Sequence, residues 1–93
     1  MKNININKIR KKLDKVDIKL LILIKERSSL VDQVLGFKKS KAEIIDQKRI
    51  DFILKRIKKE SKKIKVDPNI TVNMWKVMIK GFIKYEYRKF KNK

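Results

Sequence analysis

Two residue types that carry much of enzyme chemistry are absent from this sequence. The chain has no cysteine and no histidine, which excludes disulfide bonds, the usual zinc sites, thiol nucleophiles and imidazole acid–base catalysis. Glycine occurs twice and proline once in 93 residues, so there are few places for tight turns and no sign of β-hairpins. Any site in this chain must work through other side chains, and we expect neither a metal nor a cofactor.

Acidic residues are also few. Ten of them face 28 lysines and arginines, which gives a formal net charge of +18 and would suit a partner rich in phosphate. The lysines are nevertheless spread along the whole chain, and the densest run, residues 55–65, keeps Ile57 and Ile64 on one side. A solvated surface is the simpler interpretation of this pattern, so we do not expect nucleic acid as a partner.

Long hydrophobic runs are missing as well. The run LLILI at residues 20–24 is far too short to cross a membrane, and the first residues lack the apolar core of a signal peptide. We therefore expect a cytoplasmic protein without membrane contact. A chain of 93 residues has room for one domain with a small core, here residues 1–93.

What the sequence does contain is the periodicity of helices. Apolar residues recur at steps of three and four along residues 9–38, which predicts one long helix over about 7–39, with residues 1–7 as a frayed start. Thirty residues that rise about 1.5 Å each span roughly 45 Å, more than a compact domain of this size is wide. One end of the helix must overhang, and a second copy of the chain would cover its apolar stripe. We expect an intertwined homodimer.

Two shorter helices are predicted after the first. Asp46 has the position of an N-cap and opens a helix over about 46–64. Asp67-Pro68 opens another over about 68–90, because aspartate caps helices well and proline suits the first helical position. The periodicity lapses between the first two helices, where residues 39–45 are expected to form a loop or lid. The sequence thus predicts an all-α fold, a three-helix chain with a long first helix.

Several charged residues fall on or near the apolar stripes. Arg27 and Lys38 interrupt the stripe of the first helix about three turns apart, so both are expected to point into the apolar interior. Glu86 takes the next place on the stripe of the third helix. Arg10 lies about a quarter-turn off the first stripe and is expected to face another surface, such as that of a partner. Each residue alone also fits a structural role, with its stem buried and its charge at the edge of a helix interface.

Arginine is used sparingly, at only five positions. In a chain that uses lysine for most positive charges, an arginine suggests planar, bidentate recognition of a carboxylate or phosphate. Arg49 lies in the first turn of the second helix, an unfavourable place for a cation, although it could be a plain surface charge. Cations that outnumber acids in an apolar interior point to an anionic ligand. A basic helical nucleic-acid-binding protein and a purely structural dimer are the alternatives without catalysis.

One set of motifs runs through nearly the whole chain: IRKKLDKVDIKLLILIKER, then GFK, then IIDQKR, and then DP before an apolar helix that ends IKYEY. Over about residues 6–90, this pattern resembles the all-α (type II) chorismate mutases. The resemblance implies an intertwined dimer and the conversion of chorismate to prephenate in aromatic amino-acid biosynthesis, without a cofactor. It also implies that Arg27 and the partner subunit's Arg10 hold the two substrate carboxylates. Arg49 would line the same pocket, and Asp46 would lie at its rim near the substrate hydroxyl.

The resemblance assigns the chemistry to Lys38 and Glu86. Lys38 would reach the ether oxygen and the side-chain carboxylate of the substrate, and Glu86 would lie opposite Lys38 at the ether oxygen. The reaction is a pericyclic rearrangement, so the protein must hold a compact conformer and stabilise negative charge that grows on the ether oxygen as the C–O bond breaks. To donate a hydrogen bond to that oxygen, Glu86 must be protonated.

One position departs from the mutase pattern. Ile50 stands where many bacterial mutases have a glutamate that binds the ring hydroxyl, whereas the related isochorismate pyruvate lyases carry an apolar residue there and have a similar loop to FKKSKAEIIDQKR. The lyases and many bacterial mutases have glutamine in place of Glu86, whereas other mutases have glutamate there, and this favours the mutase. The alternative activity is the conversion of isochorismate to salicylate and pyruvate. Either substrate would be a small dicarboxylate.

Overall fold

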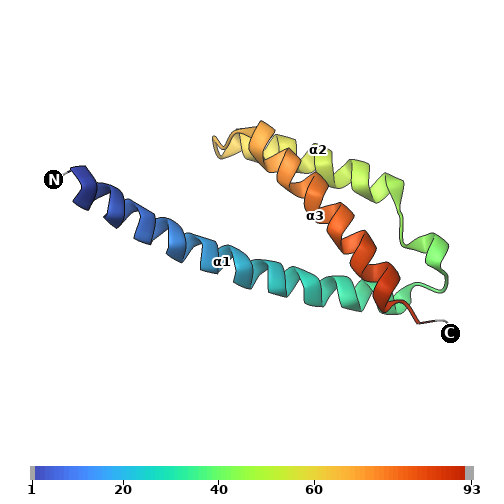
Figure 1. Ribbon diagram of the computed structural model, residues 1–93. Helices are drawn as coiled ribbons and strands as arrows, with labels where there is room; N and C mark the ends of the chain where they lie inside the picture. The colour runs from blue at the N-terminus through green and yellow to red at the C-terminus, as the bar shows by residue number, and fades with distance from the viewer. Residues whose placement is uncertain (1, 92–93) are drawn as a thin grey trace. The chain divides into compact units, whose positions relative to one another are not determined.

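The computed structural model describes residues 2–91, and side chains from residue 5 onward. All regular structure in this range is helical, without a strand, which confirms the all-α prediction of three helices. Figure 1 labels the three α-helices, and four elements follow one another along the chain. They are α1 (Lys2–Phe37), the short 3₁₀ helix η1 (Lys41–Glu43), α2 (Gln47–Lys63) and α3 (Pro68–Lys89).

The chain divides into two compact units, Met1–Val31 and Asp32–Lys93. Most of α1 forms the first unit, and the last turns of α1 join η1, α2 and α3 in the second. The expected frayed start was wrong for residues 2–7, which are helical. No glycine or proline interrupts them, and a helix extends from an existing turn at little further cost.

In the first unit, the apolar side chains of α1 lack cover. Every apolar residue from Ile6 to Ile24 is exposed in the single chain, including Leu21 and Ile22 at 60% and 61%. Helices in proteins derive most of their stability from packing of an apolar face, and here that face has no partner within its own unit. Within the described part of the chain, no helix is both long enough and apolar enough to span a membrane.

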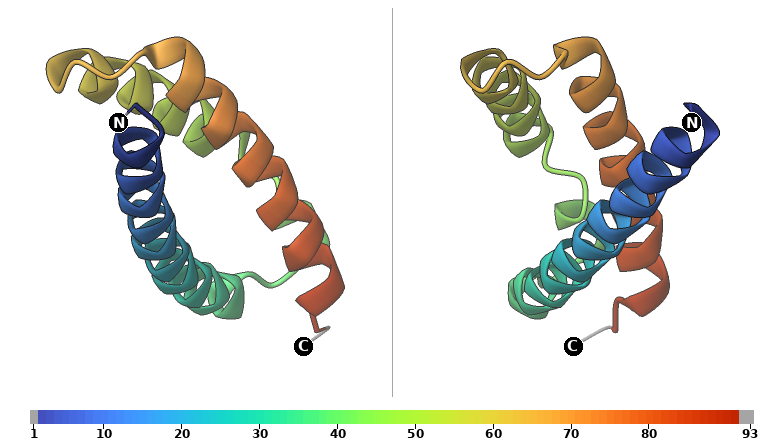
Figure 2. Two further views of the ribbon diagram at one scale, coloured as in Figure 1. Left: turned by 60° about the vertical axis from the view of Figure 1, so that its left-hand side comes forward. Right: turned by 90° about the vertical axis from the view of Figure 1, so that its left-hand side faces the viewer.

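In the second unit, α2 and α3 pack against each other, and α3 doubles back from the turn that ends α2 (Figure 2). The turn is a Schellman motif: the Val66 N–H donates to the Ser61 carbonyl at 2.9 Å, and the Lys65 N–H donates to the Lys62 carbonyl at 3.2 Å. Lys65 has a φ of 62°, in the left-handed region where glycine is the usual residue. α2 therefore ends where the sequence predicted, but without the glycine that marks most such ends.

Aspartate caps begin both helices of this unit. The Asp46 carboxylate accepts from the Arg49 N–H at 3.1 Å, and the Asp67 carboxylate accepts from the Asn69 N–H at 2.9 Å. Pro68 takes the first turn of α3, where a missing N–H leaves no helical bond unmade. The predicted starts of α2 and α3 are thus confirmed, each with the residue that was expected to cap it.

The inner faces of α2 and α3 form the core of the second unit. Ser61 on α2 is buried, and its hydroxyl lies 2.6 Å from that of Thr71 on α3. Ile79 and Glu86 are the buried residues of α3. The predicted apolar stripes supply the half-buried positions around them: Ile50, Ile53, Leu54 and Ile57 on α2, and Val72, Trp75 and Phe82 on α3.

Candidate active site

A lysine and a glutamate meet near the C-terminal end of α3. Lys38 directly follows α1, and its own N–H closes the last turn on the Leu35 carbonyl at 3.0 Å. Its Nζ lies 3.0 Å from Glu86 Oε2, and the two side chains are only 16% and 10% exposed. The same Nζ donates to the Ile44 carbonyl at 3.4 Å. The inward orientation predicted for Lys38 and Glu86 is therefore observed, and the sequence places them 48 residues apart.

The pair suits a ligand that accepts a hydrogen bond. Burial of one charge without a partner is unfavourable, and each member of this pair neutralises the other. An ammonium has three donors, and Glu86 and Ile44 engage two of them, which leaves one for a ligand. A partly dehydrated ammonium interacts more strongly with growing negative charge than one in water does.

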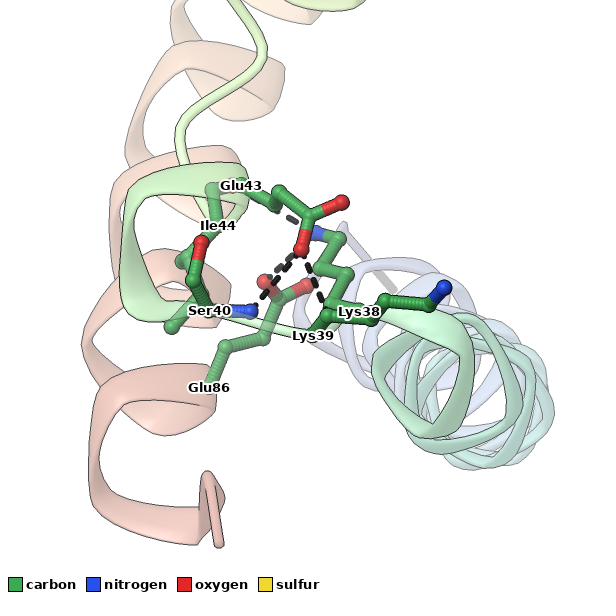
Figure 3. Close-up of polar contacts among 6 residues, drawn as sticks. All are labelled: Lys38, Lys39, Ser40, Glu43, Ile44 and Glu86. Atoms are coloured by element: carbon green, nitrogen blue, oxygen red, sulfur yellow. Dashed lines mark hydrogen bonds and ion pairs between the residues drawn. The ribbon is translucent and has the colours of Figure 1, made fainter. Parts of the chain in front are cut away.

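The loop or lid expected at residues 39–45 is held by internal hydrogen bonds. The Glu43 carboxylate accepts from the backbone N–H groups of both Lys39 and Ser40, the latter at 2.8 Å (Figure 3). These two donors, and the nearby charges of Lys39 and Lys38, hold the pKa of Glu43 below its ordinary value. Ile44 follows and is buried at 4% exposure. The segment between α1 and α2 is thus a folded turn.

Asp46 and Arg49 lie together at the start of α2. Asp46 accepts the backbone N–H of Arg49, while the Arg49 guanidinium lies 5.1 Å from the centre of the Phe52 ring. Both Asp46 and Arg49 are exposed, and Ile50 beside them is half-buried. No polar contact among the described residues links Asp46 or Arg49 to Lys38 or Glu86.

The remaining two predicted site residues belong to the first compact unit. Arg10 is exposed and Arg27 is half-buried on α1. Their approach to the Lys38–Glu86 pair stays a prediction. So does the binding role of each of the six predicted residues.

Sequence reasoning missed two contacts near the pair. The Tyr85 hydroxyl donates to Asp32 Oδ1 at 2.7 Å, and no spacing pattern indicates a pair that is 53 residues apart. Glu43 was also missed, although Ser40 and Glu43 form the Ser-x-x-Glu pattern typical of a capping box. Among the described residues, no group of acidic side chains could hold a metal ion.

Residues 9–87 match the sequence pattern of the family described as chorismate mutase type II, and the chain belongs to this family. It is 40% identical over 72 residues to the chorismate mutase of Methanocaldococcus jannaschii, a match that covers 76% of this chain and 73% of that protein. No solved structure matches the chain significantly.

Proposed function

We propose that this protein is a chorismate mutase, which rearranges chorismate to prephenate in the biosynthesis of aromatic amino acids. The observation that carries the proposal is the Lys38–Glu86 pair, with its 3.0 Å contact and low exposure, in a chain of the chorismate mutase type II family. The reaction needs no nucleophile, metal or cofactor, which fits a chain without cysteine or histidine.

The pair supplies what the reaction requires. As the C–O bond of the substrate breaks and a C–C bond forms within the same molecule, negative charge grows on the ether oxygen. Lys38 donates to this oxygen through its ammonium, and Glu86 lies on the other side of the same oxygen. The protein adds orientation, because the substrate reacts only from a compact conformer that brings the two carbon ends together.

The substrate carboxylates need cations that lie outside the pair. In this proposal Arg27 and the partner subunit's Arg10 hold the carboxylates, Arg49 lines the pocket, and Asp46 lies at its rim. An intertwined homodimer is supported by the uncovered apolar side chains of α1 from Ile6 to Ile24. The cytoplasmic location stays a prediction.

Isochorismate pyruvate lyase is the second candidate. The observation in its favour is Ile50, a half-buried apolar side chain one residue after Arg49 at the start of α2. An apolar residue cannot hydrogen-bond a ring hydroxyl, and discrimination between substrates depends strongly on such bonds. Isochorismate would then be the dicarboxylate that binds, with salicylate and pyruvate as products.

Product identification separates the two candidates. Purified protein is incubated with chorismate and, separately, with isochorismate, and the products are resolved by chromatography. We expect prephenate from chorismate as the faster reaction. Salicylate and pyruvate from isochorismate, with little prephenate, would instead establish the lyase. If neither substrate reacts, both proposals are wrong, and binding to DNA at low and high salt tests the polyanion-binding alternative.

A matched pair of lysine variants tests the site. Lys38→Ala should lower kcat by roughly a hundredfold or more, because it removes an interaction made with the transition state. Lys63→Ala is the control, since Lys63 also pairs with a glutamate, Glu60, but at 3.8 Å and with 67% of its side chain exposed. Equal activity of both variants would show that Lys38 has no part in catalysis.

A further inference from the structure

The Glu43 carboxylate binds backbone N–H groups rather than a basic side chain. Lys39 and Lys41 are close in sequence, yet among the described residues Glu43 forms no ion pair. Its carboxylate instead accepts from two consecutive backbone N–H groups, those of Lys39 and Ser40, which directly follow Lys38 (Figure 3). A carboxylate bound to amides in this way fixes the local course of the chain rather than neutralising a neighbour.

The turn that Glu43 closes can influence the position of Lys38 in two ways. One route is the backbone, because the anchored amides begin one residue after Lys38. The other runs through Ile44, which follows Glu43, is buried at 4% exposure, and offers its carbonyl to Lys38 Nζ at 3.4 Å. Both ends of the Lys38 residue, its backbone and its ammonium, are thus set by the turn that Glu43 closes.

We propose that Glu43 is a positioning residue, which holds the turn between α1 and α2 in the form that places the Lys38 ammonium against Glu86. This proposal rests on the proposed function for its kinetic consequences. Its structural claim concerns Lys38 alone and can be tested without a substrate.

Because Glu43 is exposed, its removal is expected to affect the position of Lys38 more than the stability of the fold. Glu43 is exposed, and so are Lys39 and Ser40. Water can therefore satisfy the two amides when the carboxylate is removed, and little free energy of unfolding is lost. The turn then samples other conformations, and the Lys38 ammonium is no longer held in one position against Glu86. A displacement of about 1 Å at a reacting group can lower the rate by as much as a hundredfold.

The first measurement is the accessibility of Lys38. Limited acetylation of the whole protein, read out by mass spectrometry, gives the labelling rate of each lysine. In the unaltered protein Lys38 should be labelled several-fold more slowly than the exposed Lys55. Glu43→Ala should raise the Lys38 rate toward that of Lys55, whereas Glu43→Gln, which keeps an acceptor oxygen, should leave it nearly unchanged. Glu60→Ala is the control, because it removes another exposed carboxylate.

The second measurement is kinetic. Glu43→Ala should lower kcat by about tenfold with a smaller change in KM, because Lys38 acts on the ether oxygen in the transition state. Glu43→Gln should restore most of the loss. In a Lys38→Ala background, Glu43→Ala should have little further effect, since the two residues act as one unit.

The outcomes are distinguishable. A Lys38 labelling rate that does not change in Glu43→Ala overturns the positioning role, whatever the activity. A raised labelling rate in a protein that makes no prephenate upholds the positioning of Lys38 and overturns the proposed function instead. Additive losses in the double variant would show that Glu43 acts on the reaction by a route other than Lys38.

Discussion

The hydrogen bond between Tyr85 and Asp32 lies beside the candidate site, since Tyr85 precedes Glu86 on α3 and Asp32 lies on the last turns of α1. The hydrogen bond that Tyr85 donates to the Asp32 carboxylate is the main reason why the pKa of the Tyr85 phenol lies above its ordinary value of 10.0. Burial and the negative charge of Asp32 raise this pKa further. A neutral phenol donates this bond, and an ionised one would place two anions together. Its contribution to stability is therefore present below pH 10 and is lost as the pH rises through the raised pKa.

A titration tests this pair directly. Tyr85 and Tyr87 are the tyrosines of the chain, so in a Tyr87→Phe background the absorbance change of phenol ionisation reports Tyr85 alone. Asp32→Asn in that background should move the midpoint to lower pH, because the amide accepts a hydrogen bond but carries no charge. An unchanged midpoint would show that the Asp32 contact is not made in solution.

At the scale of elements, the end of α2 carries an avoidable strain. Lys65 adopts a φ of 62° in the Schellman turn, and a residue with a Cβ pays about 1 kcal/mol or more in that region, whereas glycine does not. Lys65→Gly should therefore raise the free energy of unfolding by about 0.5–1 kcal/mol, measured by urea denaturation. Lys65→Ala is the matched control, because it removes the same charge but keeps the Cβ. Equal shifts in both variants would assign the gain to charge instead of backbone conformation.

The elements also show what could be predicted from the sequence. The starts of α2 and α3 were predictable because Asp46 and Asp67 cap helices through contacts that lie two or three residues away. The inward places of Lys38 and Glu86 followed from helical periodicity. The contact between them, and that between Asp32 and Tyr85, depends on how separate elements pack, which no local pattern encodes. The Glu43 turn is local and was missed because its segment lacks apolar periodicity.

At the scale of the whole molecule, the proposed dimer makes a quantitative prediction about shared sites. If each site takes Arg10 from one subunit and Lys38 from the other, Arg10→Ala and Lys38→Ala homodimers are both inactive. Mixed dimers of the two variants contain one intact site and one doubly altered site. After subunit exchange at equal amounts, about a quarter of the unaltered activity should return, because half of the dimers are mixed and half of their sites are intact.

The same mixture tests the alternative. Sites built within a single subunit would stay defective in every combination, and no activity would return. A dye-labelled copy, followed by fluorescence transfer, confirms that exchange has occurred, so an absence of activity would contradict the shared site rather than the mixing.

The uncovered apolar side chains of α1 also bear on how the protein is made. Because α1 precedes α2 and α3, it leaves the ribosome before them, and its residues from Ile6 to Ile24 reach water before α3 has emerged. An apolar helix in this position needs cover quickly or it aggregates. If a second copy provides that cover, the nearest source is a neighbouring nascent chain on the same messenger RNA, and the yield of folded protein would depend on how densely ribosomes are loaded.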